Sequence, residues 1–192
     1  MPSLLLASSS PYRRELLARL RLPFTCSSPD IDESRQPGED ATALVQRLAQ
    51  QKAQALADRH PDHLIIGSDQ VAVLDGEILG KPHDFERALA QLSAASGKSV
   101  SFLTGLALLN TRTGQCQIDC VPFTVHMRQL DAATLERYLR AEQPYDCAGS
   151  FKAEGLGVSL FRSTEGSDAT SLVGLPLIRL VDMLIKEGVS IP

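Results

Sequence analysis

Apolar residues follow two different patterns along this chain. The segments SLLLA at 3–7 and LIIG at 64–67 are short and nearly continuous in apolar character, which is typical of buried strands. Between residues 41 and 58 the apolar positions instead recur every three or four residues, which predicts a helix with one apolar face. Strands and helices are therefore expected to be interspersed, as in an α/β protein.

The same patterns and the turn residues between them predict the remaining elements. Expected helices cover 11–20, 41–58, 85–95, 131–141 and 171–187, the last broken near Pro176. Expected strands cover 3–7, 24–28, 98–109, 115–127 and 158–161, while 63–79 form a strand, a break, a second strand and, after a turn, a short return strand. The segments PDIDESRQPGED and AGSFKAEGLG are expected to be loops. Because 98–109 and 115–127 form a long antiparallel hairpin, we expect one mixed sheet rather than a regular doubly wound sheet.

Composition narrows the class of protein. A chain of 192 residues with 43% hydrophobic content is enough for one domain or two closely joined lobes. The formal net charge of −4 argues against a broad electrostatic grip on nucleic acid or on an anionic membrane. We also expect no signal peptide and no membrane span, and hence a cytoplasmic protein. The four cysteines and four histidines lack metal-binding spacing, so we expect neither a zinc site nor disulfides.

The start of the first expected helix carries an unusual pair of cations. Ser10 is suited to cap the helix and Pro11 to its first position, so Arg13 and Arg14 fall in the first turn, where the helix dipole disfavours positive charge. Both arginines can simply point to water. Alternatively, they hold an anion together with the backbone N–H groups of the helix start.

Four further charged residues are candidates for chemistry, each with a plain structural alternative. Asp69 follows a buried strand, where ligands of α/β proteins collect, although it can also be a turn aspartate. Lys52 shares the apolar face of its helix and points inward unless its side chain snorkels to water. Lys81 follows a hairpin and Glu33 lies in an acidic loop, and both can be ordinary solvated residues. Together with the helix start, these residues predict phosphate chemistry with a divalent ion, in which cations neutralise charge and a carboxylate manages water and metal.

Six motifs in the same order then make the sequence resemble the Maf family over nearly its whole length. They are LASSSPYRRELL, VQRLAQQKAQALA, IIGSDQ, LGKP, AGSFKAEG and LVGLPL. The resemblance implies one domain over 1–192 with an inosine-triphosphatase-like α/β fold, a mixed sheet and two lobes flanking a central cleft. It also implies a nucleoside triphosphate pyrophosphatase that cuts between the α and β phosphates with Mg²⁺, Mn²⁺ or Co²⁺, and a homodimer.

The family pattern also implies roles for individual residues. Asp69 would be the catalytic carboxylate and a metal ligand, with Glu33 as a second metal residue. The residues expected to face the substrate phosphates are Ser8, Arg13, Lys52 and Lys81.

Three positions point to a branch within the family. Tyr12, Gln70 and Glu154 differ from the branch active on dTTP and UTP and resemble the branch that hydrolyses 7-methyl-GTP, where tryptophan is usual at the position of Tyr12. The methylated guanine is positively charged, so an aromatic face attracts it by roughly 0.5 to 2 kcal/mol and a carboxylate can pair with its N1/N2 edge. Two alternatives stay open: a pyrophosphatase for other triphosphates, and a nucleotide-sensing regulator of septum formation that binds a division partner.

Overall fold

A computed structural model, which describes residues 2–191, divides the chain into two compact units. The first unit comprises Met1–Asp69, Thr104–Val121 and Asp168–Pro192, and the second comprises Gln70–Leu103 and Pro122–Ser167. The expected two lobes correspond to these units, while the cleft between them stays a prediction.

Seven strands form one mixed sheet in the order β2-β1-β3-β5-β6-β7, with β4 paired to β3. This confirms the expected mixed α/β architecture. The strands are β1 (Ser3–Ala7), β2 (Phe24–Ser27), β3 (His63–Leu74), β4 (Glu77–Leu79), β5 (Ser99–Asn110), β6 (Cys116–Met127) and β7 (Phe161–Gly166). In the first unit β1 pairs in parallel with both β2 and β3, and in the second unit β4 and β7 pair antiparallel with β3 and β6.

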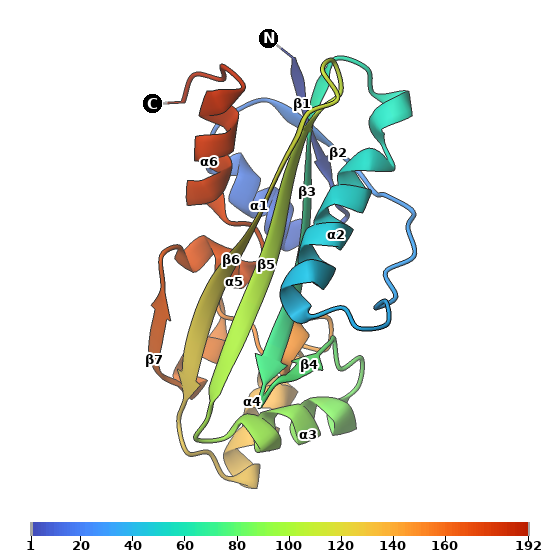
Figure 1. Cartoon of the computed structure of the whole chain (residues 1–192). Coiled ribbons are helices and arrows are strands. Elements are labelled where there is room, and N and C mark those ends of the chain that lie inside the picture. The colour runs from blue at the N-terminus through green and yellow to red at the C-terminus, as the bar shows by residue number, and fades with distance from the viewer. Residues whose placement is uncertain (1, 192) are drawn as a thin grey trace. The chain divides into compact units, whose positions relative to one another are not determined.

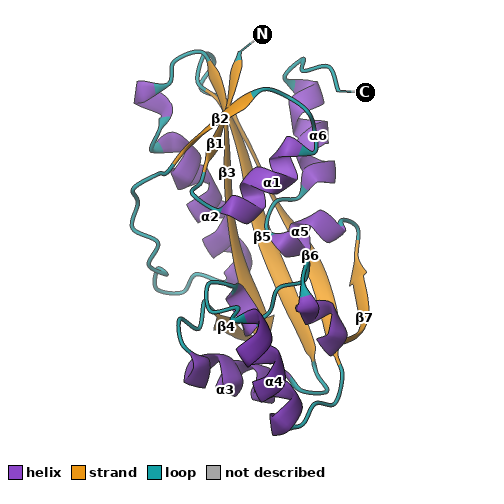
Figure 2. Ribbon diagram, turned by 180° about the vertical axis from the view of Figure 1, so that it is seen from behind, coloured by secondary structure: helices purple, strands orange, loops and turns teal. Residues whose placement is uncertain are grey.

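Helices cover both faces of the sheet in the first unit. Leu4 and Leu6 of β1 pack into a core with residues of α1 (Pro11–Ala18) and α6 (Leu177–Lys186), and Figure 2 shows these helices on one face. Leu5 and Ala7 point the other way, toward α2 (Ala41–Gln54), which lies along the opposite face in Figure 1. Burial on both faces explains why β1 is continuously apolar.

Two glycines let α2 approach the sheet closely. A Cβ atom at Gly67 of β3 would lie 2.0 Å from the carbonyl oxygen of Ala49, and one at Gly105 of β5 would lie 2.1 Å from that of Val45. Real Cβ atoms do not tolerate such distances, so the backbone of α2 lies directly against these two strands.

In the second unit, α3 (Phe85–Ala95) packs against α4 (Ala132–Glu142) and against a 3₁₀ turn at Ala148–Ser150. Phe151 makes edge contacts with Phe102 and with Phe161. The expected helix at 85–95 is confirmed, as is the cap of α4 by Asp131, whose side chain accepts from the N–H of Thr134.

Several expected boundaries were wrong. The first helix ends at Ala18 rather than near residue 20, and the second ends at Gln54 and is followed by a 3₁₀ turn at Ala57–Arg59. The last helical region is broken as expected, into α5 (Ala169–Val173) and α6, with Pro176 between them. The expected break in 63–74 is absent because β3 is continuous there: Gly67 serves the close approach of α2 rather than a turn.

The strand expected at 158–161 was placed too early. Leu156–Leu160 is a 3₁₀ helix, part of which had been expected to be a loop, and β7 begins only at Phe161. Phe161 is the only buried residue of β7, whose remaining residues are exposed. A strand with one buried residue has no apolar alternation, so the pattern could not reveal it.

Candidate active site

The start of α1 has the predicted capping geometry. Ser10 is the N-cap, with Pro11 at the first helical position, and the backbone N–H of Arg13 donates to Ser10 Oγ at 3.4 Å. The buried Ser8 hydroxyl in turn accepts from the backbone N–H of Ser10 at 3.1 Å. Arg14 is exposed, so the solvent-facing alternative holds for this arginine but not for Arg13.

Arg13 is half-buried and turned toward the protein. Its Nε–H donates to the carbonyl oxygen of Gly174 at 2.8 Å. Burial lowers the pKa of the Arg13 guanidinium, and the nearby charges of Asp69 and Glu33 partly offset this effect. The guanidinium therefore lies within electrostatic reach of both carboxylates.

Lys52 lies between those same two carboxylates. Its Nζ is 2.7 Å from Asp69 Oδ1 and 3.1 Å from Glu33 Oε1. Lys52 and Asp69 are each only 7% exposed, whereas the Glu33 side chain is 58% exposed. The prediction that Lys52 points inward is confirmed, and the solvated-loop alternative for Glu33 accounts for its exposure but not for its ion pair.

The packing of α2 explains why Lys52 and Asp69 meet. Gly67 faces α2 at Ala49, and Asp69 lies two positions further along β3, on the same face of the strand. Lys52 lies three positions after Ala49, which is about one helical turn. The glycine contact thus brings the helix that carries Lys52 directly against the strand that carries Asp69, and the long lysine side chain reaches the carboxylate.

Asp69 does not lie at a strand end, as expected, but within β3. The parallel pairing of β3 with β1 ends near Leu6 and Ile66, so Asp69 lies just beyond the carboxyl end of β1. The argument from strand ends therefore applies to the neighbouring strand β1.

Two residues of this region were missed by sequence reasoning. The fully buried Ser68 hydroxyl lies 2.8 Å from the carbonyl oxygen of Gly105 and 3.1 Å from that of Gly174. The glycine of LVGLPL signals only a turn, and nothing in the sequence places that turn against residues 13 and 68.

The other predicted site residues have different surroundings. Tyr12 belongs to the first unit and is half-buried on α1. Gln70, Lys81 and Glu154 belong to the second unit, where Gln70 is half-buried and the other two are exposed. Their part in one common site with Asp69 stays a prediction from the family resemblance.

Glu154 of the second unit is close enough to Cys147 to affect the pKa of its thiol. Burial raises the pKa of the Cys147 thiol to about 12, and the negative charges of Asp146 and Glu154 add to this effect. The backbone N–H of Lys152 donates to the Tyr138 hydroxyl at 3.0 Å and fixes the segment just before Glu154.

The carboxylates of Glu33 and Asp69 are the candidate ligands for a divalent ion. Among residues 2–191 there is no group of three or more His, Cys, Asp or Glu side chains that could hold a metal by itself. Glu33 and Asp69 do converge, on the ammonium of Lys52. Because Mg²⁺ is commonly held by one or two carboxylates plus substrate phosphates and water, these residues fit an ion that binds together with its substrate.

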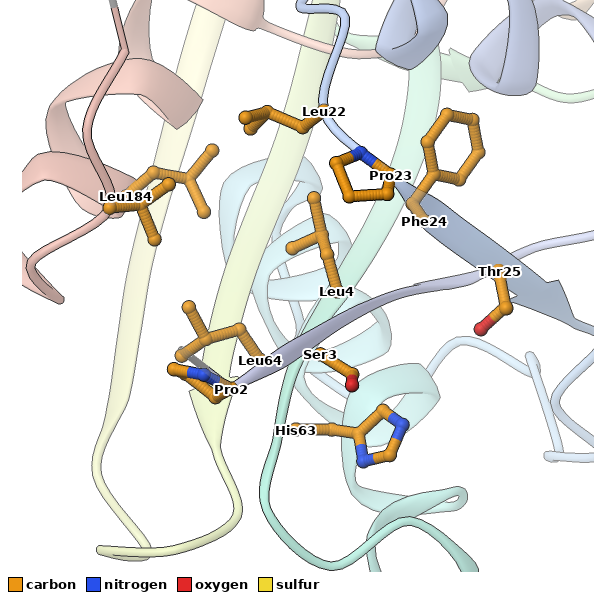
Figure 3. A pocket seen from close by; sticks show the side chains of 11 residues that line it. Pro2, Ser3, Leu4, Leu22, Pro23, Phe24, Thr25, His63, Leu64 and Leu184 are labelled. Carbon is orange, nitrogen blue, oxygen red and sulfur yellow. The ribbon is translucent and has the colours of Figure 1, made fainter.

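A cavity in the first unit has a different chemistry from the charged cluster. This cavity of about 400 Å³ lies at the amino ends of β1 and β3, and Figure 3 shows its largely apolar lining, which includes Leu4, Phe24 and Leu184. It is therefore not suited to a triphosphate.

In the described part of the chain, no helix has the length and apolar character needed to span a bilayer.

The chain is similar to known proteins over its whole length. A protein of Pseudomonas syringae pv. syringae named 7-methyl-GTP pyrophosphatase is 82% identical over all of both chains. Proteins of the same name are 73% identical in Pseudomonas aeruginosa, over all of both chains, and 62% identical in Alcanivorax borkumensis, over all of this chain and 97% of the relative. Among solved structures, protein VC0702 from Vibrio cholerae covers 74% of this chain and 72% of its own at 11% identity, but its TM-score of 0.34 is too low to bear on the fold.

The sequence profile described as "Maf-like protein" matches residues 3–187. This match covers all the motifs that first suggested the family as well as both units of the structure. The chain therefore belongs to the Maf family.

Proposed function

We propose that this protein hydrolyses 7-methyl-GTP to 7-methyl-GMP and pyrophosphate. The observation that carries the proposal is a buried carboxylate, Asp69, with the ammonium of Lys52 bonded to it and the guanidinium of Arg13 close by. Full-length relatives of 73 to 82% identity that are named 7-methyl-GTP pyrophosphatase support the choice of substrate.

The cluster has the groups that this reaction requires. A water oxygen attacks the α-phosphorus, the bond from that phosphorus to the oxygen bridging to the β-phosphate breaks, and pyrophosphate leaves with the bridging oxygen. Asp69 accepts the proton of the attacking water, while Lys52 and Arg13 stabilise the negative charge on the phosphates. An arginine has five N–H donors, of which the bond to Gly174 uses one.

A divalent ion, Mg²⁺, Mn²⁺ or Co²⁺, is part of the proposal. Asp69 and Glu33 would hold it together with the substrate phosphates, and the bound ion would supply Lewis-acid stabilisation of phosphate charge. Removal of divalent ions with EDTA is expected to abolish turnover, and re-addition of each ion in turn identifies the preferred one.

Base selection is assigned to Tyr12, Gln70 and Glu154. An aromatic ring at Tyr12 can stack on the cationic methylated guanine, and the Glu154 carboxylate can pair with its donor edge and positive charge. Gln70 directly follows Asp69 in the chain, so the base contact that we assign to it would lie next to the reacting phosphate. We also expect a homodimer, which light scattering on the purified chain can test.

The decisive experiment measures pyrophosphate release from 7-methyl-GTP, GTP, dTTP and UTP by the full chain. We expect kcat/KM for 7-methyl-GTP to exceed that for GTP by about tenfold or more, because a charged base contact is worth roughly 1.5 to 3 kcal/mol. A preference for dTTP or UTP would reject the substrate. Binding of these nucleotides without any release would instead point to a nucleotide-sensing regulator.

A further inference from the structure

A buried hydroxyl on β3, the strand that contains Asp69, shares a hydrogen-bond acceptor with Arg13 of α1. Ser68, the neighbour of Asp69 on β3, is fully buried, and its Oγ lies within hydrogen-bond distance of the carbonyl oxygens of Gly105 and Gly174. The Gly174 carbonyl also accepts from Arg13 Nε at 2.8 Å. One carbonyl oxygen is therefore shared by a fixed hydroxyl and by the guanidinium that we assign to the phosphates.

The turn that presents this carbonyl is itself held firmly. Gly174 ends α5 with φ of 127°, a conformation that L side chains rarely adopt. Buried Asp168 accepts from the backbone N–H of Thr170 and from that of Ile178, each at 2.9 Å. The Thr170 hydroxyl accepts from the backbone N–H of Leu177, also at 2.9 Å. These side chains cap α6 from outside, so the turn cannot shift without breaking the cap.

We infer that Ser68 and the Gly174 carbonyl form a positioning device for Arg13, an inference that rests on the proposed function. A free arginine side chain populates many rotamers, and it is restricted to one of them when the guanidinium binds a phosphate. This restriction costs conformational entropy. The single hydroxyl hydrogen of Ser68 is shared between the carbonyl oxygens of Gly105 at 2.8 Å and Gly174 at 3.1 Å, so Ser68 contributes to the position of the Gly174 carbonyl. Fixing Nε on this carbonyl orients the planar fork in advance. Ser68 touches no substrate in this account and acts through Arg13 alone.

The test is a double-mutant cycle with four proteins: wild type, Ser68→Ala, Arg13→Ala and the double variant. The readouts are KM and kcat for 7-methyl-GTP and the Kd of inorganic pyrophosphate by calorimetry. Ser68→Ala is expected to raise KM and Kd about 3- to 10-fold, the range for losing one hydrogen bond, with a smaller change in kcat. In the Arg13→Ala background the same substitution should change neither constant, because its target is gone.

Thr104→Val is the matched control. The Thr104 hydroxyl is equally buried and donates to the carbonyl oxygen of Ser171 in α5 at 2.9 Å. The Ser171 carbonyl also accepts from the backbone N–H of Gly174 at 3.1 Å, so this control perturbs the same turn without removing a bond to the Gly174 carbonyl or to Arg13. Both substitutions remove one buried hydroxyl, so similar losses of thermal stability are expected. Only Ser68→Ala should affect KM and Kd.

The outcomes separate the inference from the proposed function. Coupling between Ser68 and Arg13 in pyrophosphate binding, without turnover of 7-methyl-GTP, supports the inference and rejects the function. Turnover with an equal effect of Ser68→Ala in both backgrounds, or with no effect at all, overturns the inference and leaves the function standing. If Ser68→Ala does not fold, Ser68→Cys, which is close in size and a weaker donor, takes its place in the cycle.

Discussion

The candidate site residues of the two units are built into the protein in different ways. In the first unit, Lys52 and Asp69 are buried, paired at 2.7 Å and set by the contact of α2 with Gly67. In the second unit, Lys81 and Glu154 are exposed and lie outside helices and strands. The first pair is already bonded within the protein, whereas the contacts of the second pair with the substrate are part of our proposal.

The energetic consequences differ accordingly. A buried ion pair carries a large desolvation cost, and removing one partner leaves an uncompensated charge. Exposed charges contribute little to stability. Substitutions in the buried pair should therefore alter chemistry and stability together, while substitutions of the exposed residues should alter the binding or choice of substrate with little change in stability.

The largest effect is expected from Asp69→Asn. This change keeps the size of the side chain and removes the carboxylate that we propose accepts the proton of water and helps to hold the metal. We expect kcat to fall by about 10² or more. Steady-state pyrophosphate release measures the loss, and circular dichroism verifies the fold. A well-folded variant with near-normal kcat would remove Asp69 from the mechanism.

A smaller and more selective effect is expected from Glu154→Gln. The substitution removes the charge while keeping the shape, so kcat/KM for 7-methyl-GTP should fall about 10- to 100-fold, with a much smaller loss for GTP. The thermal midpoint should not change, because Glu154 is exposed.

Tyr12 supplies the companion test of base selection. Tyr12→Ala should lower the ratio of kcat/KM for 7-methyl-GTP to that for GTP, and Tyr12→Trp should hold or raise it through a larger aromatic face. An unchanged ratio in both Glu154→Gln and Tyr12→Ala would show that base selection lies elsewhere.

Lys52→Met tests whether the buried pair is as costly to break as its burial implies. The variant leaves the Asp69 carboxylate without its ammonium partner, so the free energy of unfolding should fall by about 1 to 3 kcal/mol in urea titrations. Adding Asp69→Asn to the same chain should recover part of this loss, because the unpaired charge is removed. If the two losses simply add, the pair is not coupled and the contrast between the units weakens.

The sequence predicted elements well where apolar residues recur over many positions. The helix at 85–95 and the hairpin of β5 and β6 have such patterns, and the capping residues of α1 and α4 have a local chemical signal. The 3₁₀ turn at 156–160 and the polar edge strand after it have neither. The break expected within 63–79 is absent, and the contact of Gly67 with Ala49 of α2, 18 positions earlier in the sequence, has no local signal.

The candidate site was also predictable only where the sequence has a local signal. The inward position of Lys52 follows from the helical face that it shares, and this could be predicted. The bond of Arg13 to Gly174 spans 161 positions, and that of Ser68 to Gly174 spans 106. No local pattern encodes contacts of that separation, so the positioning of Arg13 became visible only in the structure.

The smallest effect concerns the exposed loop that carries Glu33, which tests whether exposure alone makes a region unimportant for stability. Arg47 of α2 donates from Nε and Nη2 to the two carboxylate oxygens of Glu39, at 2.6 and 2.9 Å, and from Nη2 to the carbonyl oxygen of Ser34. These bonds anchor the loop next to Glu33. They also lower the pKa of Glu39 from its ordinary value of 4.5 to about 2, chiefly through the side-chain bond to Arg47.

A carboxylate whose pKa is lower in the folded than in the unfolded state stabilises the fold fully above its unfolded pKa, and that contribution disappears as the pH falls toward the folded pKa. Wild type should therefore have a slightly higher thermal midpoint than Glu39→Gln at pH 7, and the difference should shrink below pH 4.5 and vanish below about pH 2. Melting curves of both proteins across this range provide the measurement, and Glu136→Gln, at a more exposed ion pair on α4, is the control. A constant difference at every pH would mean that Glu39 stabilises the fold by packing. The charge of Glu39 would then not be needed to anchor the loop that carries Glu33.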